Sequence, residues 1–168
     1  VVHGGDLFDV PEPGLGQVGE YLEILGRLGA PMYVVPGNHD LYGNNPSTLN
    51  RTLLGFLARV GFVKLLSREP VFFGDVQITG QGYHAEMDRR DWALDYVVAA
   101  KHAKFSVHVV HGMLLPRAVA SSAPFLPAAT IAEDVLSVTK ADVTLAGHYH
   151  IPWEVRQGGR AALSPGAL

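Results

Sequence analysis

The sequence predicts an α/β fold in which parallel strands alternate with helices. Short apolar runs such as Met32–Val35 and Phe105–Val110 have the length of buried strands, and each ends abruptly in glycine or polar residues. Before the first of these runs, Gln17–Leu28 carries apolar side chains at helical spacing and ends at Gly29. A strand, a helix and a strand with short connections form a βαβ unit, which implies a parallel sheet buried on both faces.

The first half of the chain begins at the end of a strand. Residues 1–9 carry the carboxyl end of a buried strand and a glycine turn, which delivers Asp6 at the strand's end. Further along, apolar side chains at helical spacing predict a helix over Thr48–Val60. The apolar run Val63–Leu66 then predicts another strand.

The second half contains two predicted hairpins, each made of two strand-like runs around a glycine-containing turn. The paired runs are Pro70–Phe73 with Val76–Thr79, and Trp153–Gln157 with Arg160–Leu163. The elements expected between the hairpins are a helix over Asp91–Ala100, the strand Phe105–Val110, a long loop over Met113–Ala129, a helix starting at the capping box Thr130–Glu133 and the strand Val143–Ala146.

The composition is that of a globular domain. With 168 residues, 48% hydrophobic and 17% charged, the chain can bury one core, and we expect a single domain over residues 1–168. No apolar run approaches the ~20 residues of a membrane span, so no membrane contact is expected. The absence of cysteine excludes disulfides and thiolate ligands and fits a cytoplasmic protein. A net charge of -3 argues against an obvious surface for polyanions.

Polar residues cluster where four of the apolar runs end. Because the carboxyl ends of parallel strands lie on one edge of a sheet, we expect these clusters to be neighbours in space. They supply carboxylates, an amide oxygen and imidazoles without a thiolate, which suits Mn, Fe or Zn. The alternative is that they cap turns or are hydrogen-bonded core histidines. The residues concerned are Asp6, Asn38, His39, Asp40, His111, His148 and His150.

In order along the chain, four motifs resemble those of the calcineurin-like metallophosphoesterases. They are Gly5-Asp6-Leu7-Phe8-Asp9, Gly37-Asn38-His39-Asp40, His111-Gly112 and Gly147-His148-Tyr149-His150. The resemblance spans nearly the whole chain and implies a four-layer α/β/β/α sandwich with a two-metal site between its sheets. It further implies a phosphoester hydrolase in which two divalent ions, Mn before Fe or Zn, activate a bridging hydroxide for in-line attack.

The resemblance also implies a role for each residue. The metal ligands would be Asp6, bridging both ions, Asn38, His111 and His148 for the second ion, and His150 for the first. His148 and His150 lie two positions apart in the sequence. A loop after the strand could turn their side chains in different directions, so that they bind different ions. His39 would protonate the leaving oxygen or stabilise the transition state, and Asp40 or Asp9 would orient it.

One departure from the family concerns its first motif. The family carries Asp-x-His at the end of an initial strand, where it supplies two ligands to the first metal, and no Asp-x-His occurs in these residues. Either the chain is a fragment of a longer protein, or it has lost half of one metal site. We expect the former, a domain that is incomplete at its N-terminus and lacks its first strand, and that by itself binds one metal well and the other poorly.

Within the family, the motif at Val2–Asp9 and the closing Gly-His-x-His-x-Pro are most similar to SbcD-type DNA-repair exonucleases. The resemblance implies a phosphodiesterase or exonuclease with DNA as its substrate. A protein partner or further segment would grip the duplex, because 13 Lys and Arg against 16 Asp and Glu form no evident basic track. The alternatives are a small-molecule phosphatase or cyclic-nucleotide phosphodiesterase, and a non-catalytic scaffold with the same fold.

Three further features have structural interpretations. His84 is expected in a surface loop, although it could reach substrate, and His108 faces away from His111 on an alternating strand. The Met113–Ala129 loop is consistent with a lid or partner contact and equally with an ordinary loop.

Overall fold

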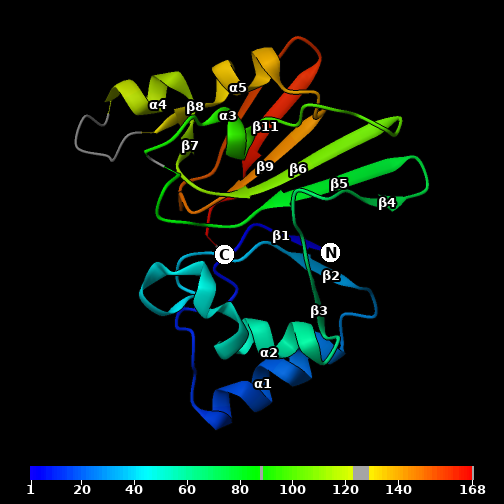
Figure 1. Cartoon of the computed structure of the whole chain (residues 1–168), viewed down its shortest axis with the longest axis vertical. Coiled ribbons are helices and arrows are strands. Elements are labelled where there is room, and N and C mark those ends of the chain that lie inside the picture. The colour runs from blue at the N-terminus through cyan, green and yellow to red at the C-terminus, as the bar shows by residue number, and fades with distance from the viewer. Residues whose placement is uncertain (88, 123–128, 168) are drawn as a thin grey trace.

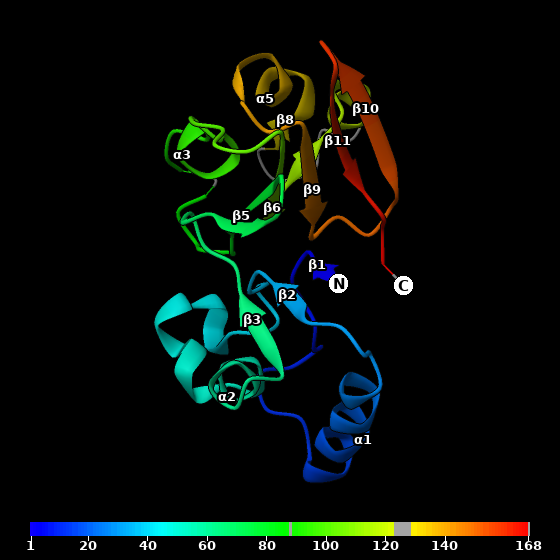
Figure 2. The ribbon, with the colours of Figure 1, turned by 90° about the vertical axis from the view of Figure 1, so that its right-hand side faces the viewer.

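Two sheets packed face to face form the centre of the molecule, and helices cover their outer faces (Figure 1). The structure, a computed structural model, describes residues 1–87, 89–122 and 129–167. The side view shows the four layers in the expected α/β/β/α order (Figure 2). In the part of the chain that is described, no helix is long and apolar enough to cross a membrane.

The smaller sheet consists of three parallel strands in sequence order. They are β1 (Val2–His3), β2 (Met32–Val34) and β3 (Val63–Leu65), and the helices on their outer side are α1 (Leu15–Gly26) and α2 (Leu53–Arg59). Val2 pairs with Tyr33, and Met32 pairs with Val63. The predicted βαβ unit is therefore confirmed.

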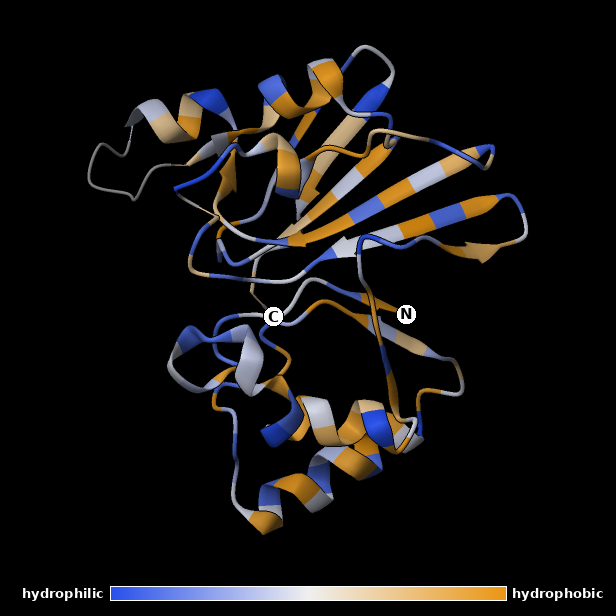
Figure 3. Cartoon of the chain, in the orientation of Figure 1, coloured by the Kyte–Doolittle hydropathy of each residue, from blue (hydrophilic) through white to orange (hydrophobic). Residues whose placement is uncertain are grey.

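Strand β2 is buried on both faces because its side chains alternate between two cores. Val34 packs with Leu54 and Leu57 of α2 under the helices, whereas Tyr33 and Val35 belong to the core between the sheets. Helices α1 and α2 show alternating hydrophobic and hydrophilic residues (Figure 3), as expected for helices with one buried side. Burial of each Val or Leu side chain contributes roughly 1.5–3 kcal/mol to stability.

The helix expected over Thr48–Val60 is divided. A short 3-10 turn, η1 (Tyr42–Asn44), is followed by a second, η2 (Pro46–Arg51), and only then by α2. The division falls at Thr52, whose hydroxyl accepts the backbone N–H of Gly55 at 3.2 Å and so caps the start of α2.

The larger sheet has six strands in the order β10-β11-β9-β6-β5-β4. Their bounds are β4 (Val71–Phe73), β5 (Val76–Gln81), β6 (Phe105–His111), β9 (Val143–Gly147), β10 (Trp153–Gln157) and β11 (Arg160–Ser164). The pairs β4–β5 and β10–β11 are antiparallel, which confirms both hairpins, and the inner pairs are parallel. Helices α3 (Ala93–Tyr96) and α5 (Ala132–Val138) lie on the outer side.

The prediction of a helix over Asp91–Ala100 is wrong in its length, because α3 ends at Tyr96. Val97 is extended, and its carbonyl accepts a hydrogen bond from the Arg68 guanidinium at 2.6 Å. The N–H of Val98 then binds the hydroxyl of Thr139 at 3.1 Å. These distant partners replace the hydrogen bonds that would have continued the helix.

The loop expected over Met113–Ala129 contains regular structure. Strand β7 (Leu114–Leu115) pairs in parallel with β8 (Thr130–Ile131), and α4 (Arg117–Ser122) follows β7; residues 123–128 lie outside the described residues. The predicted capping box is also wrong. Thr130 lies in β8, and the carboxylate of Glu133 accepts the backbone N–H of Arg117 at 3.0 Å instead of closing on its own helix.

Candidate metal centre

Four strand ends meet between the two sheets. Asp6 follows β1 and Asn38 follows β2 in the smaller sheet, while His111 ends β6 and His148 follows β9 in the larger one. Because β6 and β9 are parallel with His111 opposite Gly147, both imidazoles emerge at the same edge. The site therefore draws on both sheets.

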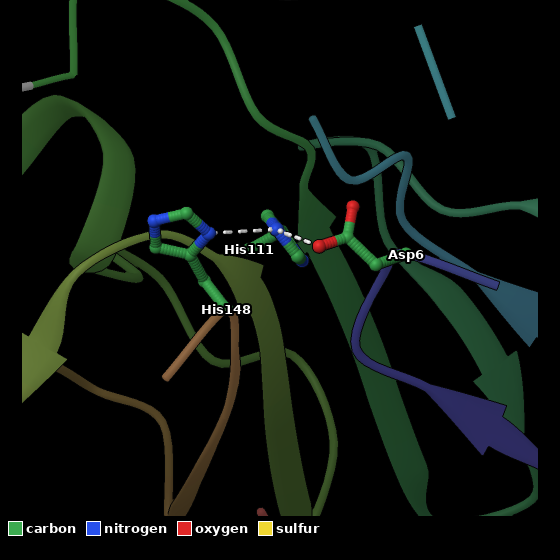
Figure 4. Close-up of side chains that lie close together, drawn as sticks. All are labelled: Asp6, His111 and His148. Carbon is green, nitrogen blue, oxygen red and sulfur yellow. Dashed lines mark hydrogen bonds and ion pairs between the residues drawn. The ribbon is translucent and has the colours of Figure 1, made fainter. Parts of the chain in front are cut away.

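The donor atoms converge on Nε2 of His111. This nitrogen lies 3.2 Å from Oδ2 of Asp6, 3.0 Å from Oδ1 of Asn38 and 3.2 Å from Nδ1 of His148. Figure 4 shows the ring of His111 between Asp6 and His148. One ligand atom each from Asp6, His111 and His148 lies within 4.8 Å of the other two, a spacing that could hold a metal ion.

The tautomer of His111 follows from its other nitrogen. Nδ1 lies 2.7 Å from the carbonyl oxygen of Gly4, and a carbonyl can only accept, so Nδ1 carries a proton. In the neutral ring Nε2 then carries no proton, and its lone pair faces the oxygens of Asp6 and Asn38. A proton on Nε2 or a metal ion among these atoms would remove the repulsion between this lone pair and the two oxygens. A histidine that donates its second N–H to a backbone carbonyl is the usual arrangement of a metal ligand.

Two glycines allow the strand ends to approach this closely. Gly5 has φ of +94°, and a Cβ on it would lie 2.3 Å from Nδ1 of His111. A Cβ on Gly37 would lie 2.1 Å from Oδ1 of Asp6. Any side chain at either position would displace a donor group.

The backbone is strained at two of the donors. Asp6 has φ of 51° and His148 has φ of 90°, a region that residues other than glycine rarely adopt. Such conformations cost roughly 1–3 kcal/mol and persist where the surrounding structure holds them for function. The strain therefore supports a functional role for the positions of the Asp6 and His148 side chains.

Asp6 is held as a carboxylate. Burial raises its pKa, but the hydrogen bond with His111 and the backbone N–H of His39, which donates to Oδ1 at 2.8 Å, outweigh burial and lower the pKa below its usual value. The ionised carboxylate is the form that binds a metal ion.

The side chain of Asp40 forms hydrogen bonds with backbone N–H groups, and not with the imidazole of His39 as far as the described hydrogen bonds go. Its buried carboxylate accepts the N–H groups of Gly37 at 2.8 Å, Phe8 at 3.1 Å and Leu7 at 3.4 Å. Burial raises the pKa of Asp40 in spite of these donors. Asp40 thus ties the two loops that carry Asp6 and His39, which differs from the expected role of orienting the imidazole.

Asp9 is the residue that contacts the imidazole of His39. Nδ1 of His39 lies 3.1 Å from the backbone oxygen of Asp9 and 3.6 Å from its carboxylate. The Asp9 carboxylate is 95% exposed, so the backbone oxygen is the firmer partner. Since Nδ1 donates to that oxygen, Nε2 of His39 is the atom available to a substrate.

His39 lines a cavity of about 660 Å³ that opens beside the metal centre. Asp6, Asp9 and His148 also line it, together with apolar residues of β1, β9 and β11. His150 lies on the same wall and is exposed; among the described residues it is not a member of the group formed by Asp6, His111 and His148.

The model of the calcineurin-like phosphoesterase family matches residues 1–152. This chain belongs to that family. Within the calcineurin-like phosphoesterases, it is 29% identical over 119 residues to the DNA double-strand break repair protein Mre11 of Halobacterium salinarum, an alignment that covers 69% of this chain and 29% of the relative. It is 35% identical over 83 residues to the protein of the same name from Methanosarcina acetivorans, covering 48% of this chain and 12% of the relative.

The chain therefore spans less than a third of the length of these relatives. A solved structure superposes with a TM-score of 0.56 over 90% of this chain and 63% of that chain, at 16% sequence identity. That likeness concerns the fold alone.

Tyr83 is a neighbour of the donor set that the sequence did not reveal. Its ring centroid lies 6.1 Å from that of His148 and 6.4 Å from that of His111. Tyr83 follows β5, the parallel neighbour of β6, so its strand also ends at this edge. The same rule of strand ends could have found it, but the expected strand stops at Thr79, and the candidate residue of this segment is the neighbouring His84.

Two other histidines bind Asp95 and lie apart from the donor set. Nε2 of His84 lies 3.0 Å from the Asp95 carboxylate, which Arg90 also pairs, and Nε2 of His108 lies 2.8 Å from the Asp95 carbonyl. Burial raises the pKa of Asp95, but the bonds from Arg90 and His84 outweigh it and lower the pKa. His108 is structural, as expected, and His84 lies in the loop after β5, as expected, where it pairs with a buried carboxylate.

Proposed function

We propose that the protein is a metal-dependent phosphodiesterase whose substrate is DNA. The observation that carries this proposal is the convergence of Asp6, Asn38 and His148 on Nε2 of His111. An oxygen-rich and imidazole-rich donor set without thiolate fits divalent Mn, Fe or Zn. Membership in a family of phosphoesterases supports the same chemistry.

The residues that would hold the metals divide into two groups. Asp6, Asn38, His111 and His148 would bind one ion, and Asp6 together with His150 would contribute to a second. When bound, divalent ions supply Lewis acidity that neutralises phosphate charge and lowers the pKa of water. We propose Mn as the metal to test first, with Fe and Zn as alternatives.

The other residues of the chain would position the substrate and move a proton. His39 stands on the wall of the cavity, with Nδ1 held by Asp9 and Nε2 available. In its doubly protonated, imidazolium form it would donate a proton or a hydrogen bond from Nε2 to the leaving oxygen of a phosphoester. Asp40 would act indirectly, because it fixes the two loops that carry Asp6 and His39.

The choice of DNA rests on the relatives, which are named as DNA double-strand break repair proteins. The physical objection is charge, since 13 Lys and Arg against 16 Asp and Glu give a net charge of -3. Affinity for DNA comes mainly from phosphate neutralisation. We therefore also propose that a protein partner or another segment grips the duplex while this domain cleaves the phosphodiester.

The test is an assay with Mn²⁺ on a panel of esters. The panel contains single-stranded DNA, double-stranded DNA ends, bis(p-nitrophenyl) phosphate, a cyclic nucleotide and p-nitrophenyl phosphate, with Asp6→Ala as the inactive control. We expect cleavage of DNA and of the aryl diester. Efficient hydrolysis of the monoester or cyclic nucleotide with DNA intact would replace the proposal by a small-molecule phosphatase or phosphodiesterase. Binding of metal without hydrolysis of any ester would favour a non-catalytic scaffold.

A further inference from the structure

A second cavity, of about 290 Å³, adjoins the metal centre and shares no lining residue with the first. Pro36 and Leu41, which line it, flank the turn that carries Asn38 and His39. Tyr83 also lines it, and its ring is in contact with those of two metal-donor histidines. Tyr83 is therefore the residue that both lines this cavity and stands beside the donor set.

The position of Tyr83 is defined by its backbone. Its N–H donates to the carbonyl of Pro36 at 2.8 Å, and a Cβ on the preceding Gly82 would lie 2.7 Å from the Pro36 ring. These close contacts hold the loop after β5 against the end of β2. They fix the backbone of Tyr83, whose ring lies beside that of His148 and lines the second cavity.

The walls of this second cavity combine apolar and polar groups. Pro36, Leu49 and Leu66 provide apolar surface, and Ser67 and Arg68 lie on the polar side. The Arg68 guanidinium donates to the carbonyls of Asp95 and Val97, and the Asp95 carboxylate, which pairs with Arg90 and His84, lies close enough to interact with it electrostatically. Apolar walls with few polar groups and one aromatic ring are typical of a site for a flat organic group.

We propose that this second cavity binds a nucleobase attached to the scissile phosphodiester. The inference rests on the proposed function and deepens it, because it names the part of the substrate that gives selectivity. The volume of about 290 Å³ is just below the ~300 Å³ at which pockets begin to hold whole small ligands, so it accommodates a fragment such as one base. Tyrosine is one of the side chains on which bases stack.

Two cavities beside one metal centre suit a diester more than a monoester. A phosphodiester carries two organic substituents, and a phosphate at Asp6 and His148 would place one in each cavity. The first cavity also contains His39, the residue that would protonate the leaving oxygen. The base in the second cavity would then belong to the substituent that remains on the phosphate.

The experiment compares two esters with the same leaving group. The p-nitrophenyl ester of thymidine 5′-monophosphate carries a base, and methyl p-nitrophenyl phosphate does not. We expect Tyr83→Ala to lower kcat/KM for the nucleotide ester roughly 5- to 150-fold relative to the methyl ester, the range of base–aromatic stacking. Tyr83→Phe, which keeps the ring, should retain the preference.

Two further variants control for indirect effects. Ser67 is exposed on the rim of the second cavity, so Ser67→Phe should fill it and reduce the nucleotide preference without touching the donor set. Tyr42→Ala removes a tyrosine that lines neither cavity and should leave the preference unchanged. Equal losses on both esters in Tyr83→Ala, with no effect of Ser67→Phe, would overturn the subsite.

A binding measurement separates this inference from the proposed function. Titration calorimetry of thymidine 5′-monophosphate and methyl phosphate against the Mn²⁺-treated protein needs no turnover. If Tyr83→Ala weakens binding of the nucleotide but not of methyl phosphate, the subsite is supported, even where neither ester is hydrolysed. Absence of hydrolysis of both esters would reject the phosphodiesterase and not the subsite. Equal binding of both phosphates by the unaltered protein would reject the subsite and leave the phosphodiesterase standing.

Discussion

At the scale of single residues, the imidazole of His111 determines how the site works. Its side chain is fully buried, one nitrogen is committed to Gly4, and the other faces two acceptor oxygens. A buried lone pair among acceptors is unfavourable unless a cation joins them. The free energy of metal binding is therefore expected to depend on Asp6 and His111 more than on any exposed residue of the cavity.

The roles of His39 and Asp6 can be separated by substitution. We predict that His39→Ala keeps its metal and lowers turnover of DNA, whose alkoxide leaving group needs a proton, by roughly 10²–10⁴-fold, the contribution of a general acid. The physical reason is that His39 is half-exposed and bonded to Asp9, outside the donor set. Asp6→Ala should lose metal and turnover together.

Metal content measured by plasma mass spectrometry, beside the rate assay, checks this prediction. His39→Gln serves as a control that keeps a polar side chain of similar reach. If the His39→Ala protein lost as much metal as the Asp6→Ala protein, His39 would have to be counted among the ligands.

At the scale of elements, a buried polar network joins β5, β6 and α3. Nδ1 of His108 on β6 lies 2.9 Å from the hydroxyl of Thr79 on β5, and Nε2 lies 2.8 Å from the carbonyl of Asp95 in α3. Burial lowers the pKa of His108 to about 4. The neutral ring is therefore part of the native packing of these elements.

The lowered pKa predicts how stability varies with pH. Between about pH 6.5 and pH 4 the unfolded chain binds a proton at His108 and the native protein does not, so the free energy of unfolding falls as the pH falls through this window. Full loss would amount to roughly 3 kcal/mol. Urea unfolding of metal-free protein from pH 7.5 to pH 4.5 measures the trend.

His108→Gln supplies the comparison for this experiment. Burial also lowers the pKa of His3, so part of the slope between pH 6.5 and pH 4 should remain in the variant. The contribution of His108 is the difference between the two slopes. Identical slopes would mean that His108 is protonated equally in the native and unfolded states.

At the scale of the whole molecule, the donor set links the two sheets. Asp6 and Asn38 extend from the smaller sheet, and His111 and His148 extend from the larger one. An ion bound by all four would hold the sheets together, and any ligand that binds only the native state raises stability by mass action.

We predict that metal raises the melting temperature. At a free Mn²⁺ concentration of 100 Kd the stabilisation is about 2.7 kcal/mol, which corresponds to a rise of roughly 5–11 °C for a domain of this size. Thermal unfolding followed by circular dichroism, with Mn²⁺ and with a chelator, measures the shift. The His39→Ala protein should show the same shift and Asp6→Ala should show none; a shift retained in Asp6→Ala would point to a different binding site.

The order of elements and the positions of the polar residues could be predicted from the sequence. Apolar periodicity is a local property, and it located the two hairpins, the βαβ unit and the strands that end at Asp6, Asn38 and His111. Parallel strands share a carboxyl edge, so the pattern predicted that Asp6 lies near Asn38 and that His111 lies near His148, but the meeting of the two pairs across two sheets was implied by the family resemblance alone. The motifs also indicated the family that the comparisons show.

Only the tertiary structure decided which partners the polar groups have. Asn38, His39 and Asp40 are consecutive, yet the first faces His111, the second faces Asp9 and the third binds backbone amides of residues up to 33 positions away. The tautomer of His111 depends on a carbonyl 107 positions away, and the second cavity depends on Tyr83 meeting Pro36. Local pattern places a residue at a strand end, but its hydrogen bonds and close contacts are set by chain segments that meet only in the folded protein.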